Sequence, residues 1–138
     1  MRNGICALVL MLLNACATTS HENLYQQLGE KSGIERIVGR LIAEIGDEPR
    51  IRKYFANTNL GRFHEKLTEQ IGELSGGPLD YSGDTMIQVH TGMDINEADF
   101  NLLAELLVNA MDAEHIPHTT QNQLIKLLTP MRPDIMYQ

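Results

Sequence analysis

The chain contains five histidines and two cysteines, the residue types that most often bind metals or act as nucleophiles. No two histidines form a His-x-x-x-His pair, and neither a Gly-rich phosphate loop nor a Gly-x-Ser-x-Gly elbow occurs in the sequence. His90 stands apart because it follows Met86 by four residues and Val89 by one. On a short helix this spacing places the imidazole on an apolar surface, where a histidine is either a core residue or a metal ligand.

The sequence predicts that helices carry the histidines and the apolar residues around them. Apolar side chains recur at i, i+3, i+4 and i+7 in every long segment after Leu24, without the alternation of a strand. The expected helices span residues 32–45, 60–74, 96–111 and 120–131, with shorter helical pieces over 47–55 and 84–91 and an irregular connection over 75–83. The sequence therefore predicts an all-α domain.

Several residues are suited to the expected helix ends. Ser32, Asn96 and Thr120 are predicted N-caps, because their short polar side chains accept hydrogen bonds from a first helical turn. Pro49 suits the first position of the brief segment, and Gly46 suits the end of the helix before it.

Length and charge restrict the function further. The 138 residues suit one domain, since domains usually have about 100–200 residues. Hydrophobic residues make up 43% of the chain but aromatic residues only 5%, which favours helices over a β-sandwich or barrel. The net charge is −7 and the sequence shows no extended basic patch, so it predicts no nucleic-acid partner.

The first residues are typical of a secretory signal. Arg2 precedes an apolar run from Ile5 to Leu13, which is shorter than the roughly 20 apolar residues that span a bilayer. Leu13-Asn14-Ala15-Cys16 resembles the lipobox of bacterial lipoproteins, in which the cysteine thiol is acylated and cleavage makes that cysteine the new N-terminus. The alternative is an ordinary secretory signal or a buried helix, with Cys16 incidental.

The lipoprotein interpretation divides the chain into a signal peptide over residues 1–15, a lipidated tether over 16–23 and a folded domain over 24–138. Removal of Cys6 and lipidation of Cys16 would leave no cysteine for disulfide or thiolate chemistry in the folded domain. We expect a membrane-anchored lipoprotein that faces the periplasm, and Ala17 after the cysteine favours the outer membrane if the host is Gram-negative.

Three segments carry a family resemblance. Phe55-Ala56-Asn57-Thr58-Asn59, Gly76-Gly77-Pro78-Leu79-Asp80-Tyr81-Ser82-Gly83 and Met86-Ile87-Gln88-Val89-His90-Thr91-Gly92, followed by Ile95 and Phe100, resemble the group I truncated haemoglobins at matching spacing. The resemblance extends from Leu24 to about Asp134. It implies a truncated globin-like two-over-two helical sandwich around a haem b (iron protoporphyrin IX).

The resemblance also implies roles for particular residues. His90 would be the proximal ligand to the haem iron, with its second ring nitrogen donating to the helix carbonyl near Met86. The implied haem contacts, with Thr58 and Arg62 at the propionates, are Phe55, Thr58, Arg62, Phe63, Leu67, Met86, Val89, Ile95, Phe100 and Leu103.

The expected distal pocket departs from the family. Many members place a Tyr and a Gln above the iron, where hydrogen-bond donors stabilise bound oxygen, but this sequence has Ile42 and Leu67 at the corresponding positions, with Phe63 nearby. Loss of such donors predicts faster oxygen release. Alternatively, His64 or Lys66 would reach the iron as a donor or sixth ligand after a modest helix rotation.

The sequence thus predicts a globin that reversibly binds oxygen, nitric oxide or carbon monoxide and depends on an unidentified reductase. One alternative is a haem-dependent redox enzyme acting as a nitric oxide dioxygenase, peroxidase or nitrite reductase. The other is a cofactor-free helical lipoprotein that binds a partner.

Overall fold

The structure, a computed structural model, describes residues 22–138. The expected signal peptide and Cys16 lie outside these residues. The helices are α1 (Leu24–Gln27), α2 (Glu30–Asp47), α3 (Pro49–Arg52), α4 (Leu60–Leu74), α5 (Met86–His90), α6 (Glu97–Ala113), α7 (His118–Leu128) and α8 (Arg132–Ile135), with 3₁₀ turns over Lys53–Phe55 and Thr129–Met131.

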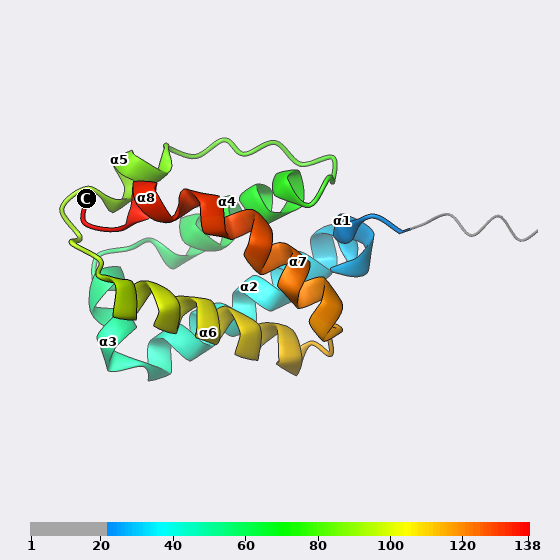
Figure 1. Ribbon diagram of the computed structural model, residues 1–138, viewed down its shortest axis with the longest axis horizontal. Coiled ribbons are helices and arrows are strands. Elements are labelled where there is room, and N and C mark those ends of the chain that lie inside the picture. Colours follow the sequence, from blue (N-terminus) through cyan, green and yellow to red (C-terminus); the bar gives the residue numbers. More distant parts are fainter. Residues whose placement is uncertain (1–21) are drawn as a thin grey trace, which may run out of the picture.

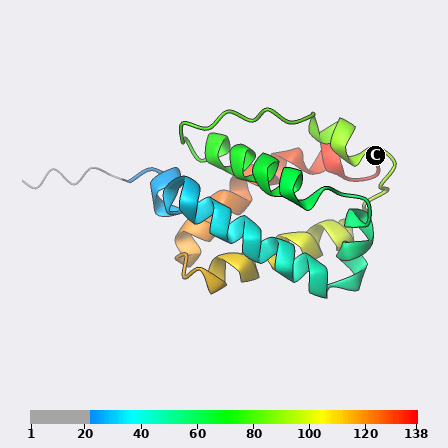
Figure 2. The same ribbon diagram turned by 180° about the vertical axis from the view of Figure 1, so that it is seen from behind.

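The long helices form two layers. In Figure 1, α6 and α7 cross in front of α2, and Figure 2, seen from behind, brings α2 and α4 to the front. α2 packs against both α4 and α6 and so connects the two layers. The short helix α5 and the C-terminal helix α8 lie together at one end of the molecule, and α1 lies at the other end.

The apolar stripe of α2 supplies much of the core. Helical spacing within the expected helix over 32–45 places six apolar residues on this stripe, and all but one are fully buried: Ile34, Ile37, Val38, Leu41 and Ile45. The exception is Ile42, which is only partly buried. α6 contributes Leu106, Leu107, Ala110 and Met111 to the same core, which confirms that these two helices pack face to face through their apolar sides.

Several predicted helix ends are confirmed, although α2 continues through Gly46 to Asp47. α4 spans the expected residues, and the Asn59 side chain accepts a hydrogen bond from the Arg62 amide at its start. Asn96 caps α6 in the same way by accepting from the Asp99 amide, and Pro49 occupies the first turn of α3. These ends depend on contacts within a few residues, so the local sequence was sufficient to predict them.

Two predicted caps are wrong. α2 begins at Glu30, ahead of Ser32, because Gly29 adopts a left-handed backbone with φ +83° and forms the N-cap. Thr120 is not a cap but a buried residue within α7, and its Oγ1 donates to Gln27 Oε1 at 3.0 Å. Ser32 thus lies inside α2 and Thr120 inside α7, so neither residue caps the helix start that was predicted for it.

No helix within residues 22–138 is long and apolar enough to span a bilayer.

Candidate functional site

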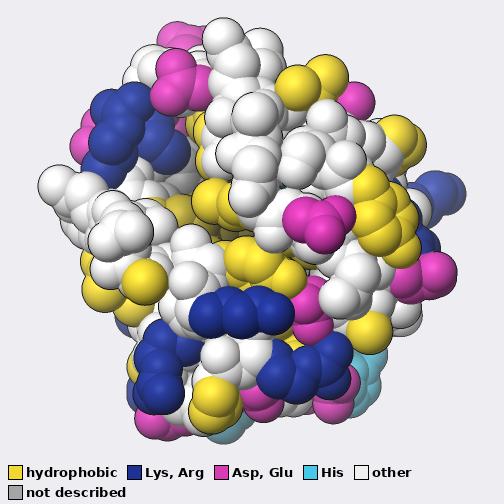
Figure 3. Space-filling view, turned by 90° about the vertical axis from the view of Figure 1, so that its left-hand side faces the viewer, with side chains coloured by type: hydrophobic (Ala, Val, Ile, Leu, Met, Phe, Trp, Pro, Cys, Tyr) yellow, Lys and Arg dark blue, Asp and Glu magenta, His cyan; other side chains and the backbone are white. Residues whose placement is uncertain are grey.

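A cavity of about 410 Å³ lies between the helix layers. It receives side chains from α2, α4, α5, α6 and α7 and from the turn that carries Phe55. Figure 3 looks onto the end of the molecule where α5 and α8 lie. It shows hydrophobic side chains gathered near the centre of this face and Lys and Arg side chains along its lower edge.

The structure brings all the residues that the resemblance assigned to cofactor contact into this one cavity. They are Phe55, Thr58, Arg62, Phe63, Leu67, Met86, Val89, Ile95, Phe100 and Leu103, and His90 and Lys66 line it as well. These residues come from positions up to 48 residues apart in the sequence (103 − 55) and from separate elements. The fold alone therefore brings them together.

His90 is the last residue of α5, which starts with a capping box. Thr85 accepts a hydrogen bond from the Gln88 amide, and the Gln88 side chain accepts one from the Thr85 amide. The His90 Nδ1 lies 2.8 Å from the backbone oxygen of Met86, which confirms the predicted contact. Because a carbonyl oxygen only accepts, we assign the proton to Nδ1, which leaves the lone pair on Nε2.

The surroundings of His90 favour its neutral form. Burial beside the cavity lowers the pKa of the imidazole below its ordinary value of 6.5, and the hydrogen bond to the Met86 carbonyl opposes this shift only in part. A neutral imidazole with an available lone pair is the form that coordinates a metal. Residues 22–138 contain no group of three or more His, Cys, Asp or Glu side chains that could hold a metal ion among themselves.

Two aromatic rings form part of the cavity wall. Phe55 and Phe63 meet edge to face, with ring centroids 5.0 Å apart and an interplanar angle of 67°. Phe100 lines the cavity from α6. Rigid rings of this kind suit a large flat apolar ligand, because they lose little side-chain entropy when they pack against it.

The family model described as "Bacterial-like globin" matches residues 23–137. This chain belongs to the bacterial-like globins. A group 1 truncated haemoglobin, GlbN of Mycolicibacterium paratuberculosis, is 28% identical over 113 residues, which cover 82% of this chain and 83% of the relative. A group 1 truncated haemoglobin of Tetrahymena pyriformis is 23% identical over 83% of this chain and 95% of its own length.

Solved structures confirm the predicted two-over-two globin fold. Truncated haemoglobin from Tetrahymena pyriformis, in its Fe(III) form, superposes with a TM-score of 0.81 at 22% identity over 85% of this chain and all (100%) of that one. The 2/2 haemoglobin from Synechococcus sp., solved in the cyanomet state with covalently attached haem, gives a TM-score of 0.77 at 17% identity over 83% of this chain and 98% of that one.

One predicted distal residue of this globin lies differently. Ile42 does not line the cavity, whereas the preceding residue, Leu41, does and is only 2% exposed. Adjacent residues on a helix point about 100° apart, so the rotation of α2 about its axis decides which of them faces the cavity. The residue that faces the cavity is still aliphatic, and the wall remains apolar at this point.

His64 also points elsewhere. Its Nε2 lies 2.9 Å from the backbone oxygen of Glu35 on α2, and the residue is not part of the cavity wall. This contact joins α4 to α2, so the ring lies at the interface between two helices.

Lys66 lines the cavity, but its ammonium group is occupied by other partners. Nζ donates to Glu65 at 2.9 Å, to Glu69 at 3.0 and 3.1 Å and to the Ser82 hydroxyl at 2.6 Å. Hydrogen bonds to Glu65 and Glu69 raise the pKa of Lys66 above its ordinary value, so the amine stays protonated.

Glu69 fastens the irregular connection to α4. Its carboxylate accepts hydrogen bonds from both the amide and the hydroxyl of Ser82. The amide of Ser82, followed by Lys66, lowers the pKa of Glu69 to about 2. Lys66 and Glu69 thus act together to hold the connection beside the cavity.

Sequence reasoning missed a buried polar cluster at the cavity wall. Asp99 is 2% exposed and accepts hydrogen bonds from Tyr54 Oη at 2.6 Å and Arg50 Nη2 at 2.7 Å. The hydrogen bond from Tyr54, followed by that from Arg50, lowers the pKa of Asp99 below 3.8 despite the opposing effect of burial. The sequence did contain one indication that Asp99 lies near the cavity: it precedes the cavity residue Leu103 by one helical turn.

Proposed function

We propose that this globin holds a haem b through His90 and reversibly binds oxygen, nitric oxide or carbon monoxide. The observation that carries the proposal is the imidazole of His90, whose Nδ1 lies 2.8 Å from the Met86 carbonyl oxygen, in the wall of a mainly apolar cavity. Bound haem would supply an iron centre that can bind a small gas molecule, and His90 would hold that iron.

The residues of the cavity suit this cofactor. Phe55 and Phe100 offer flat apolar surfaces for a porphyrin, and the aliphatic residues around them exclude water. Thr58 and Arg62 bring a hydroxyl and a guanidinium to the same cavity, where they are suited to bind the propionate carboxylates. Arg62 has an exposed side chain near Asp84, at 3.9 Å, so a propionate could replace this weak ion pair.

The side of the cavity formed by α4 favours fast release of gas ligands. Phe63 and Leu67 cannot donate hydrogen bonds, and Lys66 is held by Glu65, Glu69 and Ser82. A peroxidase or nitrite reductase needs an acid–base group near the iron, and the contact of His64 with Glu35 counts against that role. Nitric oxide dioxygenation is also disfavoured, because it needs oxygen to remain bound until nitric oxide arrives.

The experiment that tests the proposal is haem binding by the chain from residue 16 onward with Cys16→Ser. We expect a Soret band, an iron–histidine stretching band in the ferrous protein, and loss of that band in His90→Ala. His118→Ala is the matched control, because its side chain is 82% exposed and lies outside the cavity wall. Absence of a Soret band when haem is supplied would favour the cofactor-free helical protein instead.

We also propose that residues 1–15 are a lipoprotein signal and that acylated Cys16 anchors residues 16–23 and the globin domain (24–138) at the periplasmic face of a membrane. The sequence of these residues supports this proposal. Asn23 caps α1, which lies at the end of the molecule away from α5, so an anchor there would leave the α5 end exposed to solvent. Incorporation of labelled palmitate that is lost in Cys16→Ser would support it, and equal labelling of both forms would refute it.

A further inference from the structure

The end of the chain lies beside the loop that follows His90, as Figures 1 and 2 both show. The amides of Gly92 and Asp94 both donate to the backbone oxygen of Gln138, at 3.1 and 3.3 Å. The amide of Tyr137 donates in return to the Ile95 oxygen at 3.0 Å. Ile95 and Met136 form an isolated parallel bridge, so main-chain contacts join residues 92–95 to residues 136–138.

The backbone of the loop is shaped for these bonds. Gly92 has φ +83° and Asp94 has φ +48°, both in the left-handed region. Between them, the Met93 amide donates to the His90 oxygen at 3.1 Å. The loop therefore connects the last residue of α5 directly to the amides that Gln138 holds.

α5 is a short helix that packs mainly against α8 and accepts a hydrogen bond from the Gln70 amide at the Met86 sulfur, 3.4 Å away. It contains five residues, none of which is fully buried. A helix of this length is unstable by itself, because nucleation is costly and few hydrogen bonds repay it. The capping box at Thr85 fixes its first turn locally, so the orientation of its last turn depends on the residues that follow His90.

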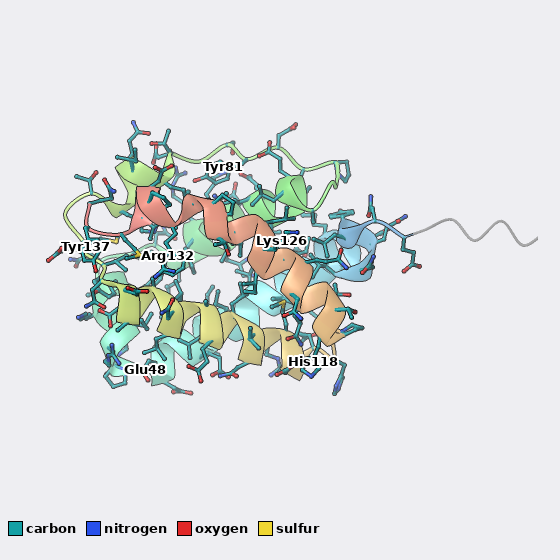
Figure 4. All side chains as sticks on the ribbon, viewed as in Figure 1. Glu48, Tyr81, His118, Lys126, Arg132 and Tyr137 are labelled. Carbon is teal, nitrogen blue, oxygen red and sulfur yellow. The ribbon has the colours of Figure 1, made fainter. Side chains whose placement is uncertain are left out.

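Arg132 strengthens the contact between the C-terminal segment and the cavity wall. Its Nη2 donates to Glu97 at 2.6 Å, and its guanidinium carbon lies 5.3 Å from the centre of the Phe100 ring. Its Nε lies 3.1 Å from the Met136 sulfur. Figure 4 shows Arg132 extending from the C-terminal segment toward the start of α6. The segment is thus held at α6 as well as at the loop after His90.

We propose that residues 136–138 are a positioning clasp for His90, an inference that rests on the proposed role of His90 as the iron ligand. The clasp holds the loop 92–95, and the loop holds the last turn of α5 through the His90 carbonyl. Its removal leaves the Met86 contact of His90 in place but allows α5 to tilt relative to the cavity. The ligand bond to iron then weakens without loss of the globin fold.

The first test removes Tyr137 and Gln138 from the haem-loaded chain and measures two properties. We expect haem transfer to excess apo-globin to become about tenfold faster, because backbone hydrogen bonds that orient the ligand are lost. We also expect the iron–histidine stretching band to shift or broaden. Tyr137→Ala is the matched control: its side chain is 63% exposed, and the substitution keeps the main-chain bonds, so both properties should match the full chain.

The second test strains the loop without shortening the chain. Gly92→Ala places a side chain at φ +83° with no atom within 4 Å, so any effect arises from the backbone rather than from a clash. Gly46→Ala is the control, since its added methyl group also meets nothing within 4 Å and its φ is not in the left-handed region. We expect Gly92→Ala to change haem loss and the stretching band in the same direction as the deletion, and Gly46→Ala to change neither.

The outcomes separate the two proposals. A normal iron–histidine band in the full chain, unchanged in both the deletion and Gly92→Ala, would overturn the clasp while the role of His90 stands. A haem-loaded full chain whose band does not depend on His90 would overturn the proposed function, and the clasp with it. If the deletion alters the circular dichroism spectrum, the fold itself is disturbed, and Gly92→Ala, which keeps every residue of the segment, then provides the test.

Discussion

On the α5 side of the cavity, a polar side chain is held in one orientation, because His90 Nδ1 lies 2.8 Å from the Met86 oxygen one turn earlier. On the α4 side, Phe63 and Leu67 are apolar, the Lys66 ammonium group is bound to Glu65, Glu69 and Ser82, and the Gln70 amide donates to the Met86 sulfur at 3.4 Å. Under the proposed function, the first side would hold the haem iron, and the second would offer a bound gas little stabilisation. Strong cofactor binding and weak ligand retention would then coexist in one small domain.

A hydrogen-bond donor placed on the apolar side should have the largest effect on this contrast. Leu67→Gln puts an amide at a cavity position, and we expect oxygen dissociation to slow by about 10- to 100-fold, since such a hydrogen bond contributes about 1.5–3 kcal/mol. Stopped-flow oxygen release measures the rate. Leu67→Met serves as the control of similar size, and an equal slowing in that variant would show that packing, not hydrogen bonding, sets the rate.

A substitution at Asp99 tests whether the polar groups in the cavity wall stabilise the fold or affect the haem iron. Asp99→Asn should lower the free energy of unfolding by about 1–2 kcal/mol, because it weakens charge-assisted bonds to Tyr54 and Arg50, and should leave the iron–histidine band unchanged. Urea unfolding measures this. Glu114→Gln is the control, with a carboxylate bonded to the exposed side chains of Arg36 and Arg40, and should cost less.

The Asp99 cluster also predicts that the free energy of unfolding depends on pH. The pKa of Asp99 is lower in the folded protein than its ordinary value of 3.8, so its ionised form stabilises the fold fully above that value. This stabilisation is lost as the pH falls through the folded-state pKa. The wild-type protein should therefore lose more stability than Asp99→Asn as the pH falls from 5 to 2. Parallel acid unfolding curves for the two proteins would contradict this assignment.

The smallest expected effect concerns Lys66 and His64. Both side chains are bound to partners that do not line the cavity, so Lys66→Ala and His64→Ala should leave a five-coordinate ferric absorption spectrum unchanged. A six-coordinate low-spin spectrum in the parent protein that becomes five-coordinate in either variant would show that the side chain leaves its partners and reaches the iron. That result would remove the contrast between the two sides.

The elements around the site differ in how well the sequence predicted them. α4 and the start of α6 were predicted correctly because Asn59 and Asn96 cap the helices within three residues of themselves. Thr120 failed as a predicted cap because its hydroxyl donates to Gln27, which is 93 residues away. The Asp99 cluster was missed for a similar reason: Arg50 lies 49 residues from it in the sequence.

The sequence by itself determined the helical class, the family and the one turn of helix that joins His90 to Met86, because these depend on periodicity and on spacing within a segment. Only the tertiary structure decided that Leu41 rather than Ile42 faces the cavity, that His64 contacts α2, and that the last residues hold the loop after His90. A helical pattern specifies which residues share a face. The rotation of that face, and the partners of its polar edges, are set by the elements that pack against it.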